Sequence, residues 1–243
     1  MKQGRLIFLL TFLCFIGVVG GIPYVNELIR EEGNPDLIWI FLVQSTILAF
    51  LASWIGVRLS AQTGLDVPVM RWLLYRNAKP EGMTRKFFHS VLLGLGIGLL
   101  IIMADTFIFS SFHSSLGDSP VISPWKGLAA SLYGGIFEEV LCRFLVMNLI
   151  VWLLIKLSRK QARSYHYWMG IIFSALFFGI FHLEATSAAF GSLTVPLILR
   201  ATILNGIPGV LFGWLFWRWG LSYAMLAHLC TDLFLHVIWV ALI

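Results

Sequence analysis

The chain has 243 residues, of which 59% are hydrophobic and only 12% are charged. A soluble domain carries roughly 45–50% apolar residues and about 25% charged ones. The composition therefore excludes an ordinary soluble globular protein and indicates a polytopic membrane protein. The formal net charge of +5 comes from lysines and arginines gathered in a few connecting segments, so it requires no nucleic-acid partner.

Seven apolar segments are long enough to cross a membrane, because a bilayer core needs about 20 mainly apolar residues per helix. The first follows Lys2 and Arg5 and ends in "GGIPYV" without a small-residue cleavage pattern, so we interpret it as a retained helix and not a signal peptide. We predict an all-α bundle of about 7–8 transmembrane helices that forms a single integral membrane domain, residues 1–243. The predicted spans cover about residues 6–25, 37–57, 89–110, 127–155, 167–183, 195–217 and 221–242.

The connecting segments alternate in charge. Segment 26–36 holds four acidic residues and one arginine, whereas segment 58–88 holds six basic residues against two acids, and segment 156–163 holds four basic residues and no acid. Basic connections gather on the cytoplasmic side, so we expect a cytoplasmic N-terminus, and we expect the membrane to be a bacterial plasma membrane. Within segment 58–88, "DVPVMRWLLYRNAK" predicts a short helix lying at the membrane interface.

Several residues within the spans have structural explanations. Glycines in "GLGIG", residues 94–98, favour close helix packing. Pro196 and Pro208 predict a kinked or interrupted sixth segment. The cysteines all fall within predicted spans, so we expect no disulfide framework; they are Cys14, Cys142 and Cys230.

The fourth span places Glu138, Glu139 and Arg143 inside a long apolar helix, in the stretch "FEEVLCRFL". A charge at a helix centre in a membrane costs at least about 2.5–3.5 kcal/mol, so such residues are candidates for function. Glu139 and Arg143 are four residues apart and can pair on one helix face. Glu138 points about 100° away and has no cation at i+3 or i+4, which leaves it suited to act as a general base. Gly134 and Gly135 lie on its side, and we expect them to leave room for a water or a peptide.

Two later spans supply histidines. "FGIFH" places Phe178 and His182 on one helix face, and "HLCTD" does the same for His228 and Asp232. At about 1.5 Å per residue, Glu138 and His182 lie at similar depth, whereas the seventh span brings its pair nearer the cytoplasmic side. Convergence therefore requires the seventh helix to start earlier or to tilt.

The other ionisable residues of the spans have plainer interpretations. Asp105 and Arg200 both fall in the outer halves of their spans and can pair with each other. His166 and His236 lie at predicted span ends, where solvation at the interface is sufficient.

Three motifs, in order on three spans, resemble those of the CPBP family, also called the ABI family. This family contains CAAX proteases and bacteriocin-processing enzymes, including the type II CAAX prenyl endopeptidases. The resemblance covers about residues 127–243, which we predict to be the catalytic core. The motifs are Glu138-Glu139-x-x-x-Arg143, then Phe178-x-x-x-His182, then His228-x-x-x-Asp232.

The resemblance implies an intramembrane endopeptidase, a peptide-bond hydrolase of the glutamate type, with no cofactor expected. Glu138 would activate a water, with His182 assisting as a second base or orienting group. His228 and Asp232 would lie near the oxyanion, and the buried pair in the fourth span would support the geometry. The catalytic residues implied in this way are Glu138, Glu139, Arg143, His182, His228 and Asp232.

One position departs from the common pattern of the family. Many members carry asparagine where this chain has Asp232. An amide can donate a hydrogen bond to an oxyanion, whereas an ionised carboxylate cannot and would repel it. We therefore expect Asp232 either to be protonated or to orient His228 and stabilise its charged form, and we favour the orienting role.

The resemblance also implies the kind of substrate. Membrane-bound or amphipathic peptides are expected, either prenylated C-terminal tails or leader, pheromone or bacteriocin-type peptides. Membrane lipid is an expected partner and nucleic acid is not. We make no prediction of oligomeric state, because Gly209-x-x-x-Gly213 can pack helices within one chain.

Other readings stay open. A zinc-dependent intramembrane metalloprotease could use the same carboxylates and imidazoles as ligands, although the chain contains no H-E-x-x-H motif. A cysteine protease built on Cys142 is disfavoured, because the charge of Glu138 beside it opposes the thiolate. A transporter or non-catalytic membrane scaffold would also bury ionisable residues. However, the Glu-Glu-x-x-x-Arg segment has no second copy, and a scaffold has no need of Glu138.

Overall fold

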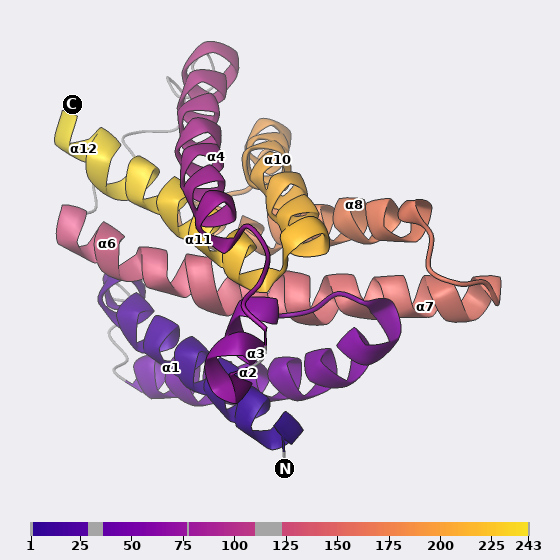
Figure 1. The fold of residues 1–243 in the computed structure, drawn as a ribbon. Coiled ribbons are helices and arrows are strands. Elements are labelled where there is room, and N and C mark those ends of the chain that lie inside the picture. Colours follow the sequence, from indigo (N-terminus) through magenta and orange to yellow (C-terminus); the bar gives the residue numbers. More distant parts are fainter. Residues whose placement is uncertain (1, 29–35, 77, 110–122, 243) are drawn as a thin grey trace.

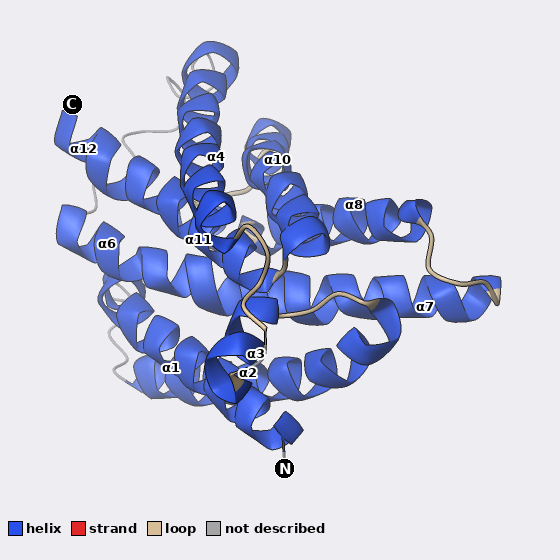
Figure 2. Cartoon of the chain, in the orientation of Figure 1, coloured by secondary structure: helices blue, strands red, loops and turns tan. Residues whose placement is uncertain are grey.

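The computed structural model describes residues 2–28, 36–76, 78–109 and 123–242. Within these ranges every regular element is a helix, and Figure 2 shows helices joined by loops with no strand. The elements are α1 (Lys2–Leu28), α2 (Asp36–Thr63), α3 (Pro68–Tyr75), α4 (Met83–Ala104), η2 (Asp105–Phe109), α6 (Pro124–Leu132), η3 (Tyr133–Glu138), η4 (Val140–Met147), α7 (Asn148–Ser158), α8 (Ser164–Phe181), α9 (Leu183–Phe190), α10 (Val195–Trp219), α11 (Leu221–Leu233), η5 (Phe234–Ile238) and α12 (Trp239–Leu242).

In the described part of the chain, seven helical runs are long and apolar enough to cross a membrane, which confirms the predicted all-α membrane bundle. Several runs extend past the predicted limits, because hydropathy marks the apolar stretch while the helix continues into the polar interface. The predicted cytoplasmic N-terminus stays a prediction, and most of the acidic segment 26–36 lies outside the described residues. The runs are Gln3–Asn26, Asp36–Thr63, Met83–Phe109, Pro124–Ser158, Ser164–Phe190, Val195–Trp219 and Leu221–Leu242.

The fourth span lies at the centre of the bundle. It runs without a break through α6, η3, η4 and α7, and crosses the middle of the view in Figure 1. Helices α1 and α2 pack along one side of it, and α8 and α11 pack against the other. Side chains of this span such as Phe144 and Met147 are fully buried. A residue in this span can therefore be contacted from several helices at once.

Two π-helical segments occupy the part of this span that carries the first motif. Segment η3 ends at Glu138, and η4 begins at Val140, so Glu139 lies between them. π-helical turns are rare and are found frequently at functional sites. The sequence predicted a regular α-helix here, and its hydrophobic pattern contains no signal for the wider turns.

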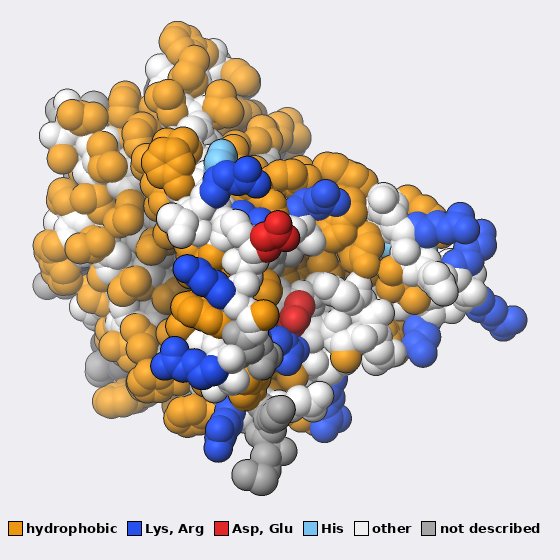
Figure 3. Space-filling model, viewed as in Figure 1, with side chains coloured by type: hydrophobic (Ala, Val, Ile, Leu, Met, Phe, Trp, Pro, Cys, Tyr) orange, Lys and Arg blue, Asp and Glu red, His pale blue; other side chains and the backbone are white. Residues whose placement is uncertain are grey.

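The surface is consistent with an integral membrane protein. Large hydrophobic side chains are exposed around the bundle, for example Phe8, Trp39 and Phe107. Figure 3 shows hydrophobic side chains over the left of this face, while lysines and arginines gather at the front and right. Apolar sides with basic residues toward an end are what lipid tails and headgroups require.

The start of α11 is covered by the connection that leads into α3. The backbone N–H of Leu221 donates to the carbonyl of Asp66 at 3.3 Å. Gly220 has φ of 110°, and a side-chain carbon there would collide with the ring of Pro68. Helix α11 therefore starts against α3 at Leu221, as the predicted span does, so an earlier start is not what brings it to the fourth span. The predicted short helix of segment 58–88 is this α3.

The sixth segment is not interrupted, so that part of the prediction is wrong. Helix α10 runs continuously from Val195 to Trp219, with Pro196 in its first turn and Pro208 in its interior. A proline in the first turn removes no helical hydrogen bond. Packing by neighbouring helices can hold a helix through an interior proline, and Pro208 is buried in this way.

Two smaller predictions are confirmed. Nε and Nη2 of Arg200 donate to Oδ1 and Oδ2 of Asp105, each at 2.7 Å. This bidentate salt bridge joins η2 to α10. The three cysteines are free and buried, as expected for packing residues.

Glycines set the close approach of α4 to α11. A side-chain carbon at Gly94 would collide with the backbone carbonyl of Ala227, and one at Gly98 would approach Phe234 to 3.0 Å. At Gly96, nothing lies within 4 Å of such a carbon. The predicted packing role of the "GLGIG" stretch thus holds for its outer glycines, while the middle glycine faces open space.

We predict different effects of Gly94→Ala and Gly96→Ala on stability. Alanine improves helix propensity by about 1 kcal/mol over glycine, so Gly96→Ala should leave the thermal unfolding midpoint in detergent unchanged or raised. Gly94→Ala should lower it, because the methyl group forces α4 away from α11. Equal midpoints for the two variants would contradict this account of the α4–α11 contact.

Candidate active site

The predicted ion pair of the fourth span is confirmed and lies wholly inside the bundle. Glu139 and Arg143 are fully buried, with Oε1 and Nη1 3.2 Å apart. Nη2 of Arg143 donates to the carbonyl of Gly209 in α10 at 3.1 Å. The guanidinium also lies over the rings of Phe178 and Phe212, at 4.6 and 5.4 Å from their centroids. Arg143 therefore joins the fourth span to α8 and α10.

His228 of α11 lies between both glutamates of the first motif. Its Nδ1 is 2.9 Å from Oε1 of Glu139, and since a carboxylate accepts, Nδ1–H is the donor. Nε2 then faces Oε2 of Glu138 at 3.9 Å and Oδ1 of Asp232 at 3.6 Å. The ring stacks on Phe212 with centroids 4.6 Å apart. The fourth and seventh spans thus converge, as the predicted site requires.

The orienting hydrogen bond of His228 comes from a different residue than expected. The sequence favoured Asp232 for this role, but its nearest oxygen is 3.6 Å from Nε2, which is longer than a hydrogen bond. Glu139 makes the bond instead, through the other ring nitrogen. Asp232 faces the nitrogen that points toward Glu138. The residue spacing within one helix could not predict this hydrogen bond, because it joins residues 89 positions apart on different helices.

Gly134 and Gly135 hold α11 close to η3. A side-chain carbon at Gly134 would collide with Oδ2 of Asp232 and would lie 3.3 Å from Nε2 of His228. One at Gly135 would lie 2.9 Å from Cβ of Leu229. The expectation that these glycines leave room for a water or a peptide is therefore corrected, because α11 fills the space above them.

His182 forms the C-terminal cap of α8. Its Nδ1 is 2.8 Å from the carbonyl oxygen of Phe178. A carbonyl only accepts, so Nδ1 carries the proton and Nε2 of the neutral ring is an acceptor. The Phe178 ring meets His182 at 4.6 Å and His228 at 5.5 Å between centroids. The shared contact with Phe178 thus links His182 to the cluster.

The cluster has a buried part and an accessible part. The side chain of Glu139 is 0% exposed, whereas Glu138 and Asp232 are 13% and 16% exposed. Two carboxylates that face the same nitrogen of His228 therefore keep some accessible surface. We name the set Glu138, Glu139, Arg143, His182, His228 and Asp232 the polar cluster.

His236 lies four residues after Asp232, in the π-helical segment η5. Its backbone packs on Gly127, and the residue is exposed. This exposure agrees with the predicted solvated span end.

Nothing in the described residues groups three or more His, Cys, Asp or Glu side chains so that they could hold a metal ion. One ring nitrogen of His228 is occupied by Glu139, which leaves it a single free nitrogen for a ligand. This arrangement therefore gives no support to a zinc-dependent metalloprotease.

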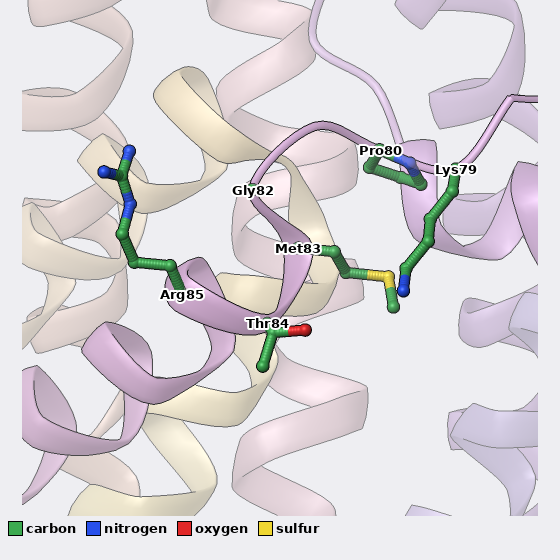
Figure 4. Close-up of a pocket in the computed structure, with 6 residues that line it drawn as sticks. All are labelled: Lys79, Pro80, Gly82, Met83, Thr84 and Arg85. Atoms are coloured by element: carbon green, nitrogen blue, oxygen red, sulfur yellow. The ribbon is translucent and has the colours of Figure 1, made fainter.

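A surface hollow lies at the connection into α4, in the basic segment 58–88. Figure 4 shows that the side chains of Lys79 and Arg85 point away from each other, so their charges do not converge on one ligand. None of the residues of the polar cluster lines it, and we infer no chemistry there. Its lining residues are Lys79, Pro80, Gly82, Met83, Thr84 and Arg85.

Comparison with known families gives a match for the part of the chain that carries the polar cluster. Residues 119–234, just under half of the chain, match the family described as type II CAAX prenyl endopeptidase Rce1-like. The chain carries an Rce1-like segment. Comparison with curated proteins found no match, and neither did comparison with solved structures.

The Rce1-like segment confirms the resemblance to the CAAX proteases of the CPBP family. It contains all three motifs, from Glu138 to Asp232, and includes most of the predicted core at 127–243. The match supports a CAAX-type intramembrane protease in general terms. The match assigns no role to a single residue and does not identify the substrate of this chain.

The two adjacent glutamates should differ in what they contribute to stability. Glu139→Ala leaves the buried guanidinium of Arg143 without its carboxylate, and breaking a buried pair in this way costs about 3–5 kcal/mol. Glu138→Ala removes a partly exposed carboxylate whose nearest basic partner is His228. The loss of stability should therefore be much smaller. Thermal unfolding of both variants in the same detergent measures the difference. Similar midpoints would refute the division of the cluster into a structural and an accessible part.

Proposed function

We propose that this chain is a glutamate-type intramembrane endopeptidase in which Glu138 activates the attacking water. The observation that carries the proposal is the contrast between the two glutamates. Glu139 is buried and bound to Arg143 and His228, whereas Glu138 keeps exposed surface beside Nε2 of His228. A general base must reach both water and the reacting carbonyl, and Glu138 is the carboxylate of the first motif that meets this condition.

The first step takes a proton from water. Glu138 accepts the proton while the water oxygen attacks the peptide carbonyl carbon, and the electron pair of the C=O bond moves to the carbonyl oxygen. Nε2 of His182 is an acceptor in its neutral form and can orient the same water or act as a second base. The tetrahedral intermediate then expels the amine, which receives the proton from Glu138.

His228 contributes at the oxyanion. With Nδ1 bound to Glu139, a protonated ring presents Nε2–H toward the space between Glu138 and Asp232 and can donate to the developing negative charge. Asp232, at 3.6 Å from that nitrogen, stabilises the charged ring from the side. Its carboxylate does not itself bind the oxyanion unless it is protonated.

The buried pair holds this arrangement in place. Arg143 fixes Glu139, Glu139 fixes the ring of His228, and the ring of Phe178 contacts both histidines and the guanidinium. A displacement of about 1 Å in such an arrangement can cost about 100-fold in rate. Glu139 and Arg143 are therefore positioning residues in this proposal.

The substrate class follows from the location of the polar cluster inside a bundle with apolar sides. A peptide that reaches it is expected to be membrane-bound or amphipathic. The Rce1-like match supports prenylated C-terminal tails as one option, and leader, pheromone or bacteriocin-type peptides are the other.

The proposal is tested by cleavage in liposomes of a peptide panel that contains a farnesylated C-a-a-X peptide and amphipathic leader peptides. Glu138→Ala and Glu138→Gln should each lower the rate at least about 100-fold, the lower range for a general base. Activity should survive a chelator. The matched control is Glu184→Gln, an exposed glutamate in α9, which should cleave like the unmodified protein.

Each other outcome has a defined meaning. Cleavage that persists in both Glu138 variants removes this residue from the mechanism. Loss of cleavage under chelation, restored by added zinc, favours the metalloprotease reading. A chain that cleaves no member of the panel while it folds normally favours the scaffold or transporter reading.

A further inference from the structure

Cleavage within a bilayer exposes polar groups of the substrate backbone. A peptide bond can be attacked where the chain is extended, and there its N–H and C=O groups lose their helical hydrogen bonds. Unsatisfied backbone groups are costly in an apolar environment. A side chain that both donates and accepts would satisfy them, and a neutral amide does so without adding a charge.

Asn205 lies on the inward face of α10, the helix that packs against α8 and α11 (Figure 1). Ala201 and Pro208, one turn before and one turn after it, are both buried. Ile203 and Ile207 lie two residues before and after it, which places them on the opposite face. They are 41% and 48% exposed, as contact with lipid requires. Asn205 therefore faces the bundle and not the lipid.

The inward face of α10 is the face that meets the polar cluster. The carbonyl of Gly209, one turn after Asn205, accepts a hydrogen bond from Nη2 of Arg143 at 3.1 Å. The ring of Phe212, two turns after Asn205, stacks on His228 with centroids 4.6 Å apart. Asn205 thus continues a row of residues that contacts the polar cluster.

Helix α8 fixes the level of Asn205. A side-chain carbon at Gly179 would lie 3.0 Å from Cα of Thr202, which is three residues before Asn205. Phe178, next to Gly179, contacts the guanidinium of Arg143 and the rings of both histidines. Asn205 lies between the contacts that α10 makes with Gly179 and with Arg143, so it is level with the polar cluster.

The amide of Asn205 has unused hydrogen-bonding capacity. Its Nδ2 donates to the carbonyl of Ala201 at 2.8 Å, which fixes the orientation of the amide because a backbone carbonyl only accepts. Among the described residues this is its one hydrogen bond, so a second N–H and Oδ1 remain available. The side chain is half-buried. It therefore keeps accessible surface although it faces inward, as Glu138 and Asp232 do.

We propose that the amide of Asn205 binds the backbone of the substrate peptide next to the bond that is cleaved. Its second N–H donates to a peptide C=O, and its Oδ1 accepts from a peptide N–H. Because both contacts are to the backbone, the residue serves prenylated tails and leader peptides alike. The inference rests on the proposed protease function and adds a substrate-binding residue to it.

The first test compares Asn205→Leu with the unmodified protein on the panel peptide that the unmodified protein cleaves. Loss of two hydrogen bonds should raise KM about 10-fold. The value of kcat should stay nearly the same, because the contacts are made equally in the ground state and the transition state. The thermal unfolding midpoint should not fall, since leucine has a similar volume. The matched control is Gln161→Leu, an exposed amide between α7 and α8, which should leave KM unaltered.

A backbone-modified substrate tests the contact itself. In a series of peptides, each peptide bond except the cleaved one is replaced in turn by an ester, which removes a single N–H. One replacement should raise KM for the unmodified protein and leave KM of Asn205→Leu unchanged, because that variant has already lost the acceptor. If every ester affects both proteins equally, Asn205 does not bind the peptide backbone.

The outcomes separate this inference from the proposed function. If Glu138→Gln abolishes cleavage while Asn205→Leu leaves KM unchanged, the binding role is overturned and the protease function stands. If Asn205→Leu lowers kcat and leaves KM unchanged, the contact belongs to the transition state, which also overturns the binding role. If Glu138→Gln retains cleavage, the proposed function itself fails.

A further measurement needs no turnover. Asn205→Cys is combined with Glu138→Gln in a chain whose three native cysteines are replaced by alanine, and the new thiol is modified with a small methanethiosulfonate reagent. The panel peptide, bound but not cleaved, should slow this modification. The control is Ile207→Cys on the lipid-facing side of α10, whose modification the peptide should not change. Equal rates for Asn205→Cys with and without the peptide would contradict the proposed contact.

Discussion

The site depends on one buried charge pair. Arg143 is a fully buried guanidinium, and a buried charge is tolerated only when it is paired and hydrogen-bonded. Glu139 supplies the opposite charge, the carbonyl of Gly209 accepts a hydrogen bond, and the guanidinium lies over the rings of Phe178 and Phe212. Because Glu139 also binds His228, the requirement to satisfy Arg143 fixes the position of a histidine in another span.

Two neighbouring residues of identical chemistry acquire different environments from the rotation of a helix. Glu139 turns inward, where it is fully buried, and Glu138 turns toward the side where 13% of its surface stays exposed. The same contrast separates the nitrogens of His228, one bound to Glu139 and the other facing two accessible carboxylates. Fully buried and partly exposed polar groups thus lie side by side, which is the arrangement that the proposed catalytic site would need.

Local spacing predicted what lies on one helix, and it could not predict what joins two helices. The seven spans and the Glu139–Arg143 pair were accessible from composition and from a four-residue interval. The partner of His228 was not, because Glu139 reaches it only after α11 has packed over Gly134 and Gly135. The π-helical turns of η3 and η4 were equally hidden, since hydrophobic periodicity reports burial and not the hydrogen-bond pattern of the backbone.

The interval between Glu139 and Arg143 also matters for how the protein is made. The fourth span is synthesised 89 residues before His228, so during membrane insertion its charges precede their later partner. Insertion of an isolated charge at mid-membrane is unfavourable by about 2.5–3.5 kcal/mol or more. Since both charges lie one turn apart on the same helix, they can neutralise each other as the span enters the bilayer. The pair that later supports the histidine thereby makes its own helix easier to insert.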